Sequence, residues 1–316
     1  MKHSPYGGPG IGFAILAAAS LLFWWRALGN TLGLALANEA YSHILLILPL
    51  SAALIYFDSK YVDSKYVDLK YKDSKCKDSK ALGIDPEPSP RLGSALLALA
   101  LLIDCYARWG MGAVPDDVRL SLGMFGLVAW WIASVVFCFG LRVFRFFLFP
   151  LCFLFLLVPV PGIVLSVIVP WLQHGSAWMA VMLFRAVGEP VQRDGILLSL
   201  PNLDIEVARE CSSIRSSLLL VTTTMVLAHL FLRSWWRNFV LILIAIPLSV
   251  AKNGLRIFVI AELGTRVDPG FLDGRLHHHG GIVFLVVALG AIVGLLAILH
   301  RGETRLELLG ASTGGR

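Results

Sequence analysis

Long apolar blocks separated by short polar segments run through almost the whole chain. A helix needs roughly 20 apolar residues to cross a bilayer core of about 30 Å, and nine blocks approach that length. They lie at residues 10–28, 43–57, 92–107, 118–140, 146–161, 163–187, 213–232, 238–262 and 280–299. The pattern predicts an all-α integral membrane protein that crosses the bilayer many times.

The composition supports this prediction. Hydrophobic residues make up 57% of the chain and charged residues only 15%, whereas soluble domains carry about 25% charged residues. The net charge of +6 comes from short basic clusters between the blocks, which favours contact with anionic lipid and not with nucleic acid. The five cysteines form no CxxC pair, so neither a disulfide framework nor a metal site is indicated.

Basic residues near the blocks predict the orientation, because cytoplasmic loops are enriched in Lys and Arg. The segment 58–91 holds seven lysines and Arg91 and is therefore predicted to be cytoplasmic, whereas the segment 29–42 has no Lys or Arg and is predicted to lie outside. The remaining arginines predicted to be cytoplasmic are Arg142, Arg145, Arg233, Arg237, Arg301 and Arg305.

These assignments require the block 163–187 to return to the side on which it began. Its polar residues, which include Gln173, His174 and Arg185, together with Pro170, favour an interfacial or re-entrant element over a spanning helix. The result is a bundle of about eight spanning helices with both termini in the cytoplasm.

Three polar segments complete the predicted organisation. Residues 58–80 repeat Lys, Asp and Ser with a period of five, which predicts a disordered cytoplasmic loop over 58–91. Apolar residues alternate around a Pro-Asn turn within 188–210, which predicts a short extracytoplasmic hairpin. Residues 1–300 are predicted to form one transmembrane domain, and 301–316 a cytoplasmic tail.

Cys211 is the first candidate for chemistry, because it stands in the polar segment EVARECSSIRSS at the outer membrane edge. Reactive thiolates need a partly exposed, electropositive setting. Glu210 precedes the cysteine, and Ser212 can cap the helix that follows. The amides and positive dipole at the start of that helix would favour a thiolate.

A second candidate group lies inside the block 238–262, which contains Lys252, Asn253 and Arg256. A cation within a membrane helix costs about 2.5–3.5 kcal/mol, so such residues usually mark function. Lys252 and Arg256 are four residues apart and share a helix face. The predicted direction of this helix places Arg256 in its outer half, on the same side as Cys211. Snorkelling, or pairing with Glu262, is the structural alternative.

The third group is the run His277, His278 and His279 before the last apolar block, which is also predicted to lie outside. Successive side chains point in different directions, so the run is a poor metal site. One of these histidines is better suited to act as general base for a thiol. A polar helix start in the headgroup region is the alternative for any single one. Arg256 is suited to stabilise either the thiolate or an oxyanion.

These motifs resemble those of the exosortase/archaeosortase family of membrane cysteine transpeptidases. ECSSIRSS resembles the family's cysteine motif, KNGLRI its arginine motif and HHHGGIVF its histidine motif. YSHILLILP at 41–49 and LVPVPG at 157–162 resemble two further landmarks, so the similarity covers at least residues 40–295. One departure is Ser213, which stands where the family usually has glycine.

The resemblance implies site residues, a reaction and a location. Cys211 would be the nucleophile, Arg256 would stabilise the thiolate or oxyanion, and His277 would transfer protons, with His278 and His279 as alternates. The substrates would be exported proteins whose C-terminal sorting signal has a short motif (Pro-Glu-Pro in the bacterial PEP-CTERM branch), a transmembrane helix and a basic tail. A thioester would then pass to a lipid-linked or exopolysaccharide-linked acceptor on the extracytoplasmic face of the inner membrane, without a cofactor.

Two other functions remain open from the sequence. The same residues could serve an intramembrane hydrolase that uses water as the acceptor. Alternatively, the chain could be a component of exopolysaccharide export or assembly that performs no catalysis.

Overall fold

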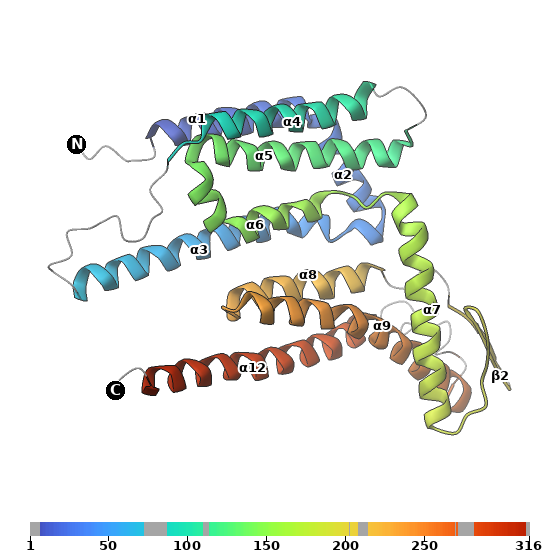
Figure 1. Cartoon of the computed structure of the whole chain (residues 1–316). Helices are drawn as coiled ribbons and strands as arrows, with labels where there is room; N and C mark the ends of the chain where they lie inside the picture. The colour runs from blue at the N-terminus through green and yellow to red at the C-terminus, as the bar shows by residue number, and fades with distance from the viewer. Residues whose placement is uncertain are drawn as a thin grey trace. The chain divides into compact units, whose positions relative to one another are not determined.

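A computed structural model describes residues 7–72, 87–109, 114–201, 203–207, 214–268, 270 and 281–313. The chain divides into two compact units, Met1–Gly162 and Ile163–Arg316, which are treated separately below. Within the described residues, seven helices are long and apolar enough to cross a membrane, or up to eight if a bent helix pair counts as one span. The predicted all-α membrane architecture is confirmed (Figure 1).

The first unit begins with a broken helix where the block 10–28 predicted a single span. Helix α1 (Gly7–Phe23) and helix α2 (Trp25–Ala37) meet at a bend of 69°. The Trp24 indole at the bend donates to Asp104 Oδ1 over 2.8 Å, and Arg108 donates to the Phe23 carbonyl over 3.1 Å. These tertiary contacts stabilise the break, and α2 occupies most of a segment predicted as a loop.

The second span continues into the Lys/Asp repeat. After a short 3-10 helix, η1 (Glu39–Tyr41), helix α3 extends from Ile44 to Lys72. Where disorder was predicted, the structure continues α3 over residues 58–72, while 73–86 lie outside the described residues. Extending an existing helix costs much less than starting one, so a polar repeat can continue a preceding apolar helix. Helix α4 (Pro90–Trp109) matches its predicted block.

Helix α5 (Asp116–Phe146) packs against α4 and contains one non-helical residue, Gly140, at φ 88°. The carbonyl of Glu87 occupies the place that a side chain at Gly140 would need. Only glycine fits this close approach and this backbone conformation. Arg142, two residues later, pairs with the Glu87 carboxylate at 3.0 Å. The end of α5 thus lies beside the segment before α4, as the orientation from basic residues requires.

The block 146–161 does not form one helix. Helix α6 (Leu148–Phe153) and the 3-10 helix η3 (Leu154–Leu157) contribute ten helical residues, and residues 158–161 are non-helical. Together the pieces reach about 30 Å, because non-helical residues rise about twice as far as helical ones. Ser121 Oγ donates to the Pro159 carbonyl (2.7 Å), and Tyr41 Oη donates to the Val160 carbonyl (2.9 Å). The segment therefore returns along α5, as predicted, but with side chains satisfying part of its backbone.

The second unit contains the predicted hairpin, enlarged to three strands. Strands β1 (Gln192–Asp194), β2 (Leu197–Leu200) and β3 (Leu203–Glu206) form an antiparallel sheet in the order β1-β2-β3. The β2–β3 connection falls at the predicted Pro-Asn turn. The two-residue β1–β2 turn begins with Gly195 at φ 61°, which is typical of tight hairpin turns.

Helix α7 (Gly162–Ala186) is one continuous helix and is not a re-entrant loop. It passes the length and composition test for a span. However, Figure 1 shows it lying across the direction of α8, α9 and α12 and not alongside them, which is the arrangement of an interfacial helix. Ala177, Ala180, Val181 and Phe184 pack in one buried cluster with Leu198 of the sheet and Ile257 of α9.

Helices α8 (Ile214–Phe231), α9 (Trp235–Arg266) and α12 (Gly281–Thr313) form the remaining bundle. Small residues such as Ala228, Ala245 and Ala288 meet Leu220, Leu241 and Ile292 in their shared core. Small side chains allow membrane helices to approach closely. Because α12 runs to Thr313, most of the predicted 301–316 tail is a continuation of this helix.

Candidate active site

The predicted site residues fall into two sets. Lys252, Asn253 and Arg256 are described by the structure, all on α9. The segments that carry the predicted nucleophile and base, Glu210–Cys211–Ser212 and His277–His279, lie outside the described residues. The structure does describe the chain on both sides of each segment, and those flanking residues locate the site.

Lys252, Asn253 and Arg256 lie far along α9 from its start. At 1.5 Å per residue, the 21 residues from Trp235 to Arg256 span about 32 Å, close to the roughly 30 Å of a bilayer core. The cluster is therefore near the end of the span and not at its middle. Glu262, the alternative partner predicted for Arg256, pairs instead with Arg266 at 2.8 Å.

Lys252 is only 5% exposed, and its ammonium group donates to the hydroxyl of Ser216. Ser216 lies in the first turn of α8, five residues after Cys211. This contact fixes the start of the helix that follows the predicted nucleophile against α9. The sequence identified Lys252 but not its partner.

Asn253 is 1% exposed, and its amide donates to Ser176 Oγ of α7 over 3.0 Å. The two helices meet closely at this point, because a methyl group at Gly254 would lie 2.6 Å from Cβ of Met179. Small residues at the crossing are the usual means of bringing two membrane helices together. The sequence did not predict the roles of Ser176 and Gly254, because it gave no sign that α7 packs against α9.

Arg256 lies next to the start of α12. A methyl group at Gly281 would lie 4.0 Å from Nη1 of Arg256, so the first residue of α12 lies beside the guanidinium. The histidines 277–279 precede Gly281 by two to four residues. Gly281, the first described residue after this run, is therefore the one that lies beside Arg256.

The chain entering the cysteine segment is also anchored. The Gln173 side chain of α7 donates to the Val207 carbonyl over 2.7 Å, and the Val207 amide donates to the Ile196 carbonyl over 3.0 Å. Cys211 is four residues after Val207 and five before Ser216. The described chain is therefore held on both sides of the cysteine segment, at Val207 and at Ser216.

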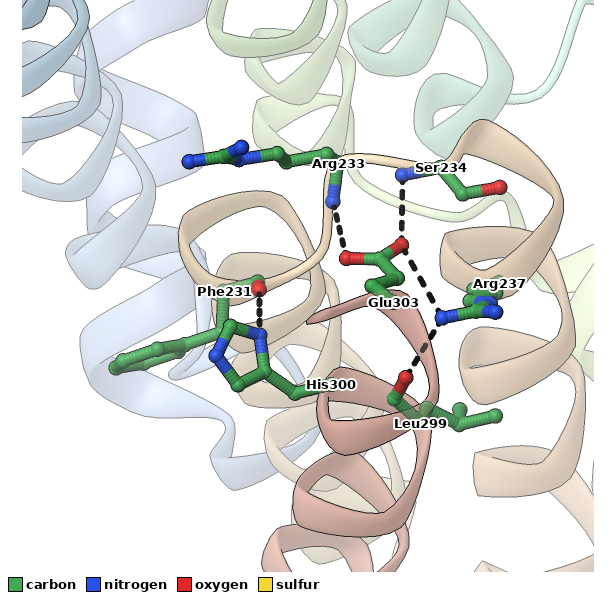
Figure 2. A network of polar contacts seen from close by, with 7 residues as sticks. All are labelled: Phe231, Arg233, Ser234, Arg237, Leu299, His300 and Glu303. Atoms are coloured by element: carbon green, nitrogen blue, oxygen red, sulfur yellow. Dashed lines mark hydrogen bonds and ion pairs between the residues drawn. The ribbon is translucent and has the colours of Figure 1, made fainter. Parts of the chain in front are cut away.

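A second polar network joins the same three helices at their opposite ends (Figure 2). The Glu303 carboxylate of α12 accepts from the Arg233 amide at 3.1 Å and the Ser234 amide at 2.9 Å. Arg237 lies 3.8 Å from the same carboxylate and donates to the Leu299 carbonyl at 2.8 Å. The two arginines were predicted to be cytoplasmic, whereas the role of Glu303 was not foreseen.

Each network therefore marks one end of the α8, α9 and α12 bundle. One end is tied by a carboxylate to the α8–α9 connection. The other end brings Lys252, Asn253 and Arg256 to the start of α8, to α7 and to the start of α12. A guanidinium at this end of the bundle, beside Gly281, is suited to stabilise a thiolate or an oxyanion.

Comparison with known proteins adds one finding. A family model described as transmembrane exosortase matches residues 24–294, which cover most of both units and every predicted site residue. No curated protein matches the chain, and no solved structure does.

Proposed function

The chain belongs to the transmembrane exosortase family, and from that membership we propose that it is a cysteine transpeptidase that processes C-terminal sorting signals of exported proteins. Membership supports a membrane-bound sorting role in general. The substrate, the nucleophile and the acceptor are the finer part of the proposal.

One observation carries the assignment of the site: the α9 turn from Lys252 to Arg256 contacts the starts of both α8 and α12. The segment with Cys211 ends at the first of these helices, and the segment with His277–His279 ends at the second. The described residues that adjoin the cysteine and histidine motifs, Ser216 and Gly281, thus lie at the same end of the bundle as the arginine motif. This convergence was not required by their separation in the sequence.

The proposed reaction has two steps. The Cys211 thiolate attacks the carbonyl carbon of the scissile peptide bond, and the leaving amine takes a proton from the histidinium form of His277, with His278 or His279 as alternates. The acceptor nucleophile then loses its proton to the histidine and attacks the thioester, which releases the Cys211 thiolate and regenerates the histidinium. Arg256 stabilises the thiolate before attack and the oxyanion during it. Glu210 and Ser212 support the nucleophile's segment.

The proposed location is the extracytoplasmic face of the cytoplasmic (inner) membrane. It is supported by Arg233 and Arg237 at the opposite end of the bundle, because arginines in short loops favour the cytoplasm. On this topology the scissile bond lies where a membrane-anchored sorting signal leaves the bilayer. The acceptor is a lipid-linked or exopolysaccharide-linked group.

The test is co-expression of the enzyme with an exported protein that carries a PEP-CTERM-type tail. Cleavage is followed by a size shift, and Cys211→Ala is compared with Cys152→Ala, which removes an exposed free cysteine of the first unit. We expect processing to be lost in the first variant and retained in the second. Processing by a stably inserted Cys211→Ala protein would refute the proposal. A thioester that hydrolyses without transferring to any added amine or sugar would point to a hydrolase instead.

A further inference from the structure

One turn of α9 makes contact with three different elements of the second unit. Lys252 donates to Ser216 of α8, Asn253 donates to Ser176 of α7, and Arg256 lies beside Gly281 of α12. Only Arg256 has a chemical role in the proposed reaction. The other two side chains are more deeply buried than Arg256 and face hydroxyl groups.

Lys252 is an unfavourable choice if stability alone were at stake. Burying an ammonium group costs several kcal/mol, and a neutral hydroxyl offsets less of that cost than a carboxylate would. An apolar side chain of similar volume is often at least as stable at such a site. The lysine instead fixes the relative position of α9 and α8, because a charge-assisted hydrogen bond holds its donor and acceptor close together in a defined geometry.

The acceptor of this bond, Ser216, lies close in sequence to the predicted nucleophile. Ser216 is in the first turn of α8, and a helix transmits a shift or rotation of its first turn to the residues just before it. Cys211 is five residues upstream of Ser216, whereas the preceding anchor, Val207, is held by Gln173. The described residues on either side of the cysteine segment are thus held, Val207 by Gln173 of α7 and Ser216 by Lys252.

We propose that Lys252 is a positioning residue that, through its hydrogen bond to Ser216, sets the place of the Cys211 thiol relative to Arg256. The inference rests on the proposed function above, because it requires Cys211 to be the nucleophile. Lys252 touches no reacting atom in this account. Misplacing a catalytic group by about 1 Å can cost about 100-fold in rate.

The test compares Lys252→Met, Ser216→Ala and the double variant in membranes or detergent, with a sorting-signal peptide as substrate. Lys252→Met keeps an unbranched side chain that is one atom shorter and removes the donor, and Ser216→Ala removes one oxygen atom. Ser249→Ala is the matched control, because this buried serine one turn before Lys252 donates only to its own helix at Ile246. Steady-state kinetics and the rate of Cys211 alkylation are both measured.

We expect each single variant to lower kcat by about 10- to 100-fold with little change in KM, which is the pattern for a misplaced catalytic group. The double variant should be no worse than the poorer single variant, because both remove the same bond. Lys252→Arg, which retains a donor, should recover part of the rate. Ser249→Ala should match the wild type.

Three outcomes would overturn the inference. They are full activity in Ser216→Ala, a double variant whose loss is the product of the two single losses, or losses that appear only in KM. If Lys252→Met fails to accumulate in the membrane, Ser216→Ala carries the test alone. Activity in Cys211→Ala would refute the proposed function itself, whereas an inactive Cys211→Ala beside a fully active Lys252→Met would refute only the role of Lys252.

Discussion

Glu303 provides a quantitative test of how the second unit is held together. Its carboxylate is 9% exposed and accepts hydrogen bonds from the two successive amides of Arg233 and Ser234, just before α9 begins (Figure 2). Glu303→Gln keeps the shape of the side chain but removes its charge. One of its two oxygens also becomes an NH2 group, which would face an amide donor.

The magnitude follows from these contacts. A hydrogen bond to a charged group contributes about 1.5–3 kcal/mol, and a buried donor left without an acceptor costs about 1–3 kcal/mol. One bond is lost and the other becomes neutral, so we expect Glu303→Gln to lower the free energy of unfolding by about 2–4 kcal/mol. For a unit of this size that corresponds to a fall in Tm of roughly 5–12 °C.

The assay is thermal unfolding in detergent, followed by the loss of the helical circular dichroism signal. The matched control is Glu87→Gln, which alters the Arg142 pair in the first unit, where both side chains are more than half exposed. Exposed pairs contribute at most about 1 kcal/mol, so the control should shift Tm by no more than about 3 °C. Equal shifts in the two variants would refute the argument that Glu303 holds the α8–α9 connection against α12.

Three further outcomes are expected. Gly254→Ala should lower the free energy of unfolding by about 1–3 kcal/mol in the same assay, because its methyl group would overlap Met179, and an unchanged Tm would contradict the close crossing. Asp104→Asn should cost about 2 kcal/mol, because it weakens the bond from Arg108 Nε at 2.5 Å, and a stability equal to the wild type would contradict a role for this pair at the α1–α2 break. Cys211 should react with a membrane-impermeant thiol reagent added to cells with a permeable outer membrane, and labelling only after inner-membrane lysis would reverse the proposed topology.

Much of the fold was predictable because the length of an apolar block and the basic residues beside it can be read from a single segment. Blocks such as 92–107 and 118–140 match α4 and α5, and alternation around the Pro-Asn turn predicted the β2–β3 hairpin. Arg256 was identifiable as a candidate site residue because a cation in an apolar block is costly. Each of these signals is carried by a single segment and needs no knowledge of its neighbours.

The features that were missed depend on contacts between distant segments. The break at Trp24 is stabilised by Asp104, 80 residues away, and nothing in the apolar block itself marks it. In the sequence, nothing distinguishes Ser216 from other serines at polar helix starts, and its role appears only when its contact with Lys252 is known. The need for glycine at position 254 likewise depends on its close approach to Met179 of α7. Pairings of this kind require the packing of helices to be known.

The irregular return of residues 158–161 along α5 has a consequence for biogenesis. In lipid, a carbonyl without a hydrogen-bond donor costs several kcal/mol, and the carbonyls of Pro159 and Val160 receive their donors from Ser121 and Tyr41. This stretch therefore cannot move from the translocon into the bilayer as an independent apolar helix. It has to settle against α5 and the η1 region after both are already in the bilayer, which makes it a late step in the insertion of the first unit.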